Sequence, residues 1–65
     1  HKFNQRELEF LKLACSDITY REIAAIMNLS ERTIDGYRAV CFDKLNVQSR
    51  TGMVLVALRK SLIKL

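Results

Sequence analysis

The sequence predicts an all-α fold of four helices, at about residues 5–16, 20–27, 31–45 and 50–63. In these segments apolar residues recur at intervals of three and four, which is the period of an amphipathic helix. A residue able to cap a helix N-terminus precedes each segment. The chain of 65 residues has no proline and only two glycines, so nothing in it resembles a linker. We therefore expect residues 1–65 to form one domain.

The first predicted helix starts after Asn4, whose side chain can accept a hydrogen bond from the first turn. Glu7, three residues later, can accept one from the Asn4 amide, so the two residues form a capping box. Cys15 in this helix and Cys41 in the third fall at apolar positions. Two cysteines are too few for a disulfide framework and their spacing matches no metal motif, so we expect buried, reduced thiols.

The second and third helices form the stretch around which the chain is organised. Thr19 and Glu22 make another capping box, and Ser30 can cap the third helix. Only Asn28 and Leu29 separate the two helices, and asparagine adopts a left-handed turn conformation more readily than other non-glycine residues. This arrangement is typical of a helix-turn-helix that binds DNA.

The outward face of the third helix is predicted to read the DNA bases in the major groove. Arg38 suits a bidentate contact to guanine, and Asp35 can accept from cytosine or orient Arg38 or Arg32 through a pair within the helix. Gly36 costs about 1 kcal/mol relative to alanine, so it either marks a close approach to the backbone or is merely tolerated. The predicted base-reading residues are Asp35, Gly36, Arg38 and Ala39. On the inner face we expect Ile34, Tyr37, Val40 or Cys41, and Leu45.

Hydroxyl, aromatic and basic side chains near the helix ends are predicted to contact the DNA backbone, because free N–H groups and hydroxyls are natural phosphate ligands. These residues are Thr19, Tyr20, Arg21, Ser30, Arg32, Thr33, Tyr37, Lys44, Ser49 and Arg50. The net charge of +4 and the pI near 9.4 suit a polyanionic partner without proving one.

The fourth helix, capped by Ser49, is apolar nearly all round. We expect Val54, Ala57 and Leu58 to pack on the core, leaving Met53, Val56 and Lys60 facing elsewhere. A second apolar face predicts a homodimer through this helix, although the same face would also suit packing against other parts of a parent chain. The predicted dimer interface consists of Met53, Val56, Ala57 and Lys60.

Catalysis is not expected, because the only histidine is His1 and no Ser-His-Asp or Cys-His set can be assembled. The sequence has no glycine-rich phosphate loop, and we expect neither a cofactor nor a bound metal. The longest apolar run, residues 53–58, is too short to span a bilayer, so no membrane association is expected. Reduced thiols and the absence of a visible signal peptide favour a cytoplasmic protein.

Three stretches resemble one family of bacterial transcription regulators. They are FNQRELEFLKLAC at the start, ITYREIAAIMNLSERTI across the two central helices, and KLNVQSR before the last helix. Together they resemble the C-terminal DNA-binding domain of the LuxR/NarL (FixJ) family over essentially the whole chain. The residues that make this resemblance specific are Glu7, Glu22, Ile23, Ala24, Ser30, Thr33, Lys44, Leu45 and Arg50.

The resemblance implies a third helix in the major groove, a fourth helix that supports dimers on inverted repeats, and a receiver or ligand-sensing domain upstream. It also implies backbone or structural roles for Thr33, Lys44 and Arg50. The sequence departs from the family where Asp35 replaces a frequent lysine and Tyr37 a frequent histidine. Asn4 and Asp17 replace the usual threonine cap and glycine. We therefore carry over the docking mode but no base preference.

Two other functions remain open. A helical protein-interaction module that has lost DNA binding would fit Asp35 and the apolar fourth helix. A promoter-binding region of a sigma factor uses a related helix-turn-helix but should lack that apolar surface. Because the chain starts at His1 and enters a helix almost at once, we expect it to be part of a longer regulator.

Overall fold

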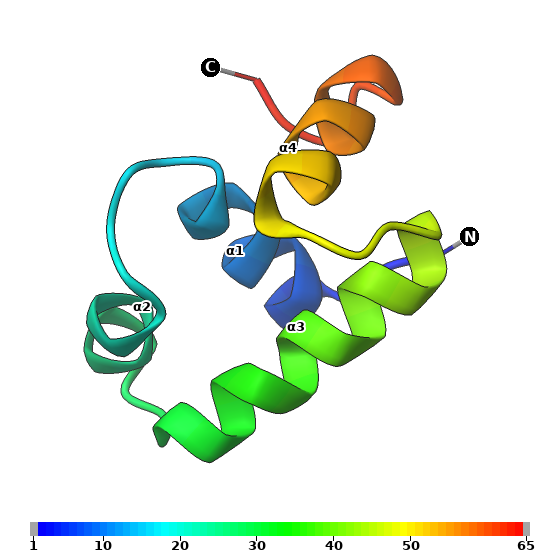
Figure 1. Ribbon diagram of the computed structural model, residues 1–65. Coiled ribbons are helices and arrows are strands. Elements are labelled where there is room, and N and C mark those ends of the chain that lie inside the picture. The colour runs from blue at the N-terminus through cyan, green and yellow to red at the C-terminus, as the bar shows by residue number, and fades with distance from the viewer. Residues whose placement is uncertain (1, 65) are drawn as a thin grey trace.

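The computed structural model describes residues 2–64, and they form four α-helices and no strand. The helices are α1 (Gln5–Ala14), α2 (Tyr20–Met27), α3 (Glu31–Leu45) and α4 (Arg50–Arg59). The predicted all-α, four-helix fold is confirmed. Figure 1 shows α1 in the middle of the molecule, between α2, α3 and α4, and α1 contacts each of them. None of the described helices is long and apolar enough to cross a membrane.

The predicted caps are present at all four helix starts. The Glu7 amide donates to Asn4 Oδ1 at 2.8 Å, and the Asn4 amide donates to Glu7 Oε1 at 2.9 Å. Thr19 and Glu22 exchange the equivalent pair of bonds at the start of α2. Hydroxyl caps begin the remaining helices, at Ser30 and Ser49. Because each cap lies next to its helix in the sequence, local chemistry sets these four starts.

Left-handed residues end α2, α3 and α4. Asn28, Asn46 and Ser61 have φ angles of 57°, 55° and 58°. After each of them the chain folds back and donates to a carbonyl of the last helical turn; in α4, Leu62 N–H donates to Ala57 O at 2.9 Å. The predicted turn at Asn28 is confirmed. The prediction that α4 runs to residue 63 is wrong, because the left-handed Ser61 stops it at Arg59.

α1 also ends earlier than predicted, at Ala14 rather than at residue 16. The Ser16 hydroxyl donates to the Leu13 carbonyl at 2.7 Å, and the Ser16 amide donates to the same carbonyl at 3.2 Å. Serine side chains compete with the helical ladder in this way. The last turn therefore tightens, and the helix does not continue into residues 15 and 16.

The core lies between the four helices. Cys41 is fully buried, whereas Val40 is 37% exposed, so Cys41 is the inward residue of the two that the sequence left open. Ile63 turns back after α4 and is buried as well. The apolar core residues are Phe10, Leu11, Ala14, Ile23, Ala24, Met27, Ile34, Cys41, Leu45, Met53, Ala57 and Ile63.

α4 presents a different face to the core than predicted. Met53, expected to face outward, is fully buried together with Ala57, whereas Leu55 is 59% exposed. Val56 is half-buried against the core and Lys60 is exposed. A helix that is apolar nearly all round has no single stripe to fix its rotation, so contacts with α1 and α3 decide which side is buried.

Candidate nucleic-acid interface

α2 and α3 form a helix-turn-helix with one helix face left open. Ala24, only 3% exposed, and the fully buried Ile34 belong to the core, and the half-buried Leu29 between the two helices packs against it. Figure 1 shows α3 along one edge of the molecule, with no other helix covering its outer side. The open side of α3 is therefore the surface on which a ligand can lie.

The residues predicted to face outward on α3 do so. Arg38 is half-exposed, and its Nη2 lies 3.8 Å from Asp35 Oδ1. This is the intrahelical pair weighed as one role for Asp35, formed here with Arg38. The exposed residues around Arg38 are Arg32, Asp35, Gly36, Ala39 and Asp43.

Gly36 has no packing reason to be glycine in the structure. A Cβ placed on it would meet no heavy atom within 4 Å, apart from its own helix backbone and chain neighbours. Its φ is not positive, so alanine would fit the backbone without strain. Nothing inside the described chain therefore requires this helix to carry a glycine.

Tyr20 sits among aromatic and cationic groups. Its ring lies 6.1 Å from that of Phe10, and the guanidinium carbons of Arg38 and Arg50 lie 5.4 and 4.9 Å from its centroid. Its hydroxyl is buried without a hydrogen-bond partner among the described residues. Burial raises the pKa of Tyr20, against the opposing effect of Arg50 and Arg38. The buried hydroxyl is not exposed to a phosphate in this arrangement, and the DNA-backbone contact expected of Tyr20 stays a prediction.

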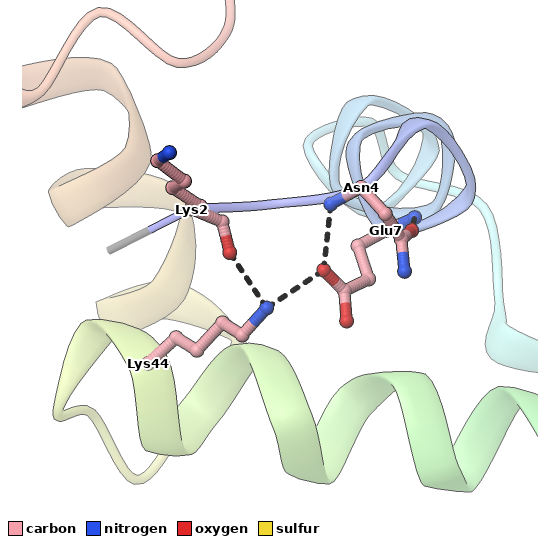
Figure 2. A network of polar contacts seen from close by, with 4 residues as sticks. All are labelled: Lys2, Asn4, Glu7 and Lys44. Atoms are coloured by element: carbon pink, nitrogen blue, oxygen red, sulfur yellow. Dashed lines mark hydrogen bonds and ion pairs between the residues drawn. The ribbon is translucent and has the colours of Figure 1, made fainter.

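Lys44 joins the end of α3 to the start of α1 (Figure 2). Its ammonium donates to Glu7 Oε1 at 2.8 Å and to the Lys2 carbonyl at 2.7 Å, and it lies 5.1 Å from the centroid of the Phe3 ring. The hydrogen bonds from Lys44 and from the Asn4 amide lower the pKa of Glu7, against the cost of its burial. The side chain predicted to hold a phosphate thus already has partners within the chain.

Arg50 is also committed inside the chain. Its Nε donates to the Ala14 carbonyl at 3.0 Å and its Nη2 to the Ser16 carbonyl at 2.9 Å, which fastens α4 to the end of α1. The sequence pattern did not reveal these contacts, since the partners lie 34 and 36 residues apart. For Lys44 the sequence did hold one signal. Glu7 lies on the apolar face of α1, and a carboxylate buried there needs a cation beside it.

The other predicted backbone contacts are mostly on the surface. Tyr37 is the exception: it is half-buried and its ring lies 6.2 Å from that of Phe10. The exposed members are Thr19, Arg21, Ser30, Arg32, Thr33 and Ser49. Three of them begin helices, where unpaired N–H groups and the positive end of the helix dipole favour an anion.

Both thiols are free; Cys41 is buried, as predicted, whereas Cys15 is only half-buried. Burial raises the pKa of Cys41 to about 11, and it raises the pKa of the half-buried Cys15 as well. Among residues 2–64 no three side chains of His, Cys, Asp or Glu gather as they would around a metal ion.

Comparison with known proteins identifies the family. Residues 1–57 match the bacterial regulatory proteins of the luxR family. The chain belongs to the luxR family. A relative is the oxygen regulatory protein NreC of Staphylococcus carnosus (strain TM300), 33% identical over 60 residues, which make up 92% of this chain and 28% of NreC. The chain thus spans less than a third of the relative's length. The luxR family consists of bacterial regulatory proteins.

Proposed function

We propose that this chain binds double-stranded DNA and regulates transcription, with α3 in the major groove. The observation that carries the proposal is the open outer face of α3, the helix that follows α2 after the left-handed turn at Asn28. Membership of a family of bacterial regulatory proteins supports it. The residues proposed to meet the base edges are Asp35, Gly36, Arg38 and Ala39.

The phosphate contacts of the proposal come from exposed residues at the starts of α2, α3 and α4. Arg21 and Arg32 supply charge there, next to capping hydroxyls. Lys44 and Arg50 instead hold the framework, because their donors already bind carbonyls and a carboxylate. The proposed phosphate-contacting residues are Thr19, Arg21, Ser30, Arg32, Thr33 and Ser49.

We also propose that two copies bind an inverted repeat through α4. Met53 and Ala57 are excluded from this interface by their burial, so the exposed side of α4 must supply it. That side carries an exposed Leu55 beside half-buried Val54 and Leu58, at helical spacings of one, three and four. One helix of ten residues buries less than a standard interface, so we expect pairing to be weak without DNA.

The relative NreC is much longer than this chain. NreC is named an oxygen regulatory protein, and most of its length lies outside the matched part. We propose that this chain is the DNA-binding part of a regulator that also carries an upstream receiver or sensor domain.

Binding to duplexes selected from a random pool, measured over a series of salt concentrations, tests the proposal. Affinity should fall steeply with salt, as counterion release requires. Arg38→Ala should relax preference at one base pair by about 1–3 kcal/mol, and Arg32→Ala should weaken all duplexes and reduce the salt slope by about 1. Lys12→Ala removes the same charge from the exposed side of α1 and serves as the control.

A protein-interaction module without DNA binding is the second candidate. The carboxylate of Asp35 on the reading face and the exposed Leu55 on α4 favour it. If the affinity for duplex DNA changes neither with salt concentration nor with Arg38→Ala or Arg32→Ala, the DNA proposal is excluded and the protein-interaction module remains.

A further inference from the structure

We propose that Tyr20 positions Arg38, so that the guanidinium is already held at the reading face of α3 before it meets a guanine. This inference rests on the proposed function, because it assigns a task to the residue proposed to read that base. Tyr20 belongs to α2 and Arg38 to α3, so the contact crosses the helix-turn-helix. Tyr20 itself would touch no DNA.

The geometry around Arg38 leaves its hydrogen-bond donors available. Its guanidinium carbon lies 5.4 Å from the Tyr20 centroid, within the range of a cation–π contact. The distance of 3.8 Å to Asp35 is longer than a hydrogen bond. Ring and carboxylate thus restrict the guanidinium without using the N–H groups that a bidentate contact to guanine requires.

The aromatic ring of Tyr20, and not its hydroxyl, restricts the Arg38 guanidinium. The Tyr20 hydroxyl is buried and makes no hydrogen bond to a described residue, so removing it leaves no partner unsatisfied. The ring is fixed from behind by Phe10, whose ring plane is inclined to it by only 13°. An aromatic ring held in this way can orient a neighbouring cation, whereas an aliphatic side chain of similar size cannot.

The competing role for Tyr20 is purely structural. The same ring lies 4.9 Å from the guanidinium carbon of Arg50, which fastens α4 to the end of α1. If the ring positions Arg50 alone, its loss should destabilise the fold and lower the affinity for every duplex equally. If the ring positions Arg38, its loss should change the preference for one base pair.

The experiment compares Tyr20→Phe and Tyr20→Leu in the 65-residue chain. The duplexes are the preferred one and a version with the guanine·cytosine pair replaced at the position where Arg38→Ala flattens preference. Tyr20→Phe keeps the ring and should keep the ratio of the two affinities. Tyr20→Leu should lower that ratio roughly two- to tenfold, the range expected when a flexible side chain must be ordered on binding.

A double substitution makes the test specific. In an Arg38→Ala background, Tyr20→Leu should change the ratio no further, because the group that it positions is gone. An equal loss for both duplexes, or an additive loss in the double variant, overturns the inference. So does an Arg38→Ala chain that keeps its preference. Wild-type chain that binds no duplex overturns the proposed function too.

A measurement on the unaltered chain guards against a Tyr20→Leu variant that does not fold. Protons over an aromatic ring face resonate upfield, so the side-chain protons of Arg38 should be shifted upfield relative to those of the exposed Arg32. Tyr20→Phe should preserve the shift. Resonances of Arg38 that match those of Arg32 in the folded chain would overturn the inference without any leucine variant.

Discussion

The Lys44 ammonium lies 2.8 Å from Glu7 Oε1, the same oxygen that accepts the Asn4 amide at the start of α1. One carboxylate oxygen therefore serves both the cap of α1 and the attachment of α3. The Glu7 side chain is only 9% exposed and that of Lys44 28%, so the pair is shielded from water on one side.

Lys44→Met should destabilise the chain by about 1–3 kcal/mol, because it leaves the charged and nearly buried Glu7 without its cation. Urea unfolding followed by circular dichroism measures the change. Lys12→Met, on the exposed side of α1, is the matched control and should change stability by less than about 0.5 kcal/mol. Equal effects of the two substitutions would mean that the pair of Lys44 with Glu7 does not stabilise the fold.

Stability should fall in acid because of Glu7. Its pKa is lowered below the ordinary value of 4.5, chiefly by the hydrogen bond from Lys44. A carboxyl whose folded-state pKa is lowered contributes stability above its unfolded pKa and loses it as pH falls through the folded value. Melting temperature should thus drop below about pH 4.5. In Glu7→Gln the drop should be shallower, and an unchanged profile would contradict this account.

Gly36→Ala should stabilise the free chain by about 0.5–1 kcal/mol, since alanine is the better helix former and the space is empty. We expect the same variant to bind DNA several-fold more weakly, because the added methyl lies on the face proposed to enter the groove. Melting curves and duplex titrations measure the two effects. Tighter binding of DNA by Gly36→Ala would mean that the glycine is merely tolerated.

Leu55→Asp should abolish self-association through α4. Sedimentation of the wild-type chain over a concentration series should show weak pairing, and the variant should stay monomeric. Ile26→Asp is the control, because Ile26 on α2 is 60% exposed against 59% for Leu55. If all three proteins behave alike, α4 does not join two copies.

Features set by neighbouring residues could be predicted from the sequence, and features set by distant ones could not. The caps at Asn4 and Thr19 and the turn at Asn28 depend on residues within four positions. The end of α4 could not be predicted, because a left-handed conformation is common for glycine at a helix end and unusual for a serine such as Ser61. The rotation of α4, which buries Met53, is set by its contacts with other helices. The apolar pattern of α4 itself does not indicate this rotation.

The candidate site shows the same division. The outward positions of α3 follow from helical geometry, so the exposure of Asp35 and Gly36 could be predicted. The partners of Lys44 and Arg50 lie 34 to 42 residues away in the chain, and charge alone could not separate them from phosphate-binding cations. The contact between Tyr20 and Arg38 needs the packing of two helices and has no signature in either.

The contacts of α1 with all three other helices also bear on the order of folding. Of these four helices a ribosome makes α1 first, so each of the other three emerges when its packing partner α1 has already been synthesised. The core closes only when Met53 and Ala57 arrive with α4. A nascent chain that stops after α3 would therefore hold α3 on an open core, which closes when α4 has been made.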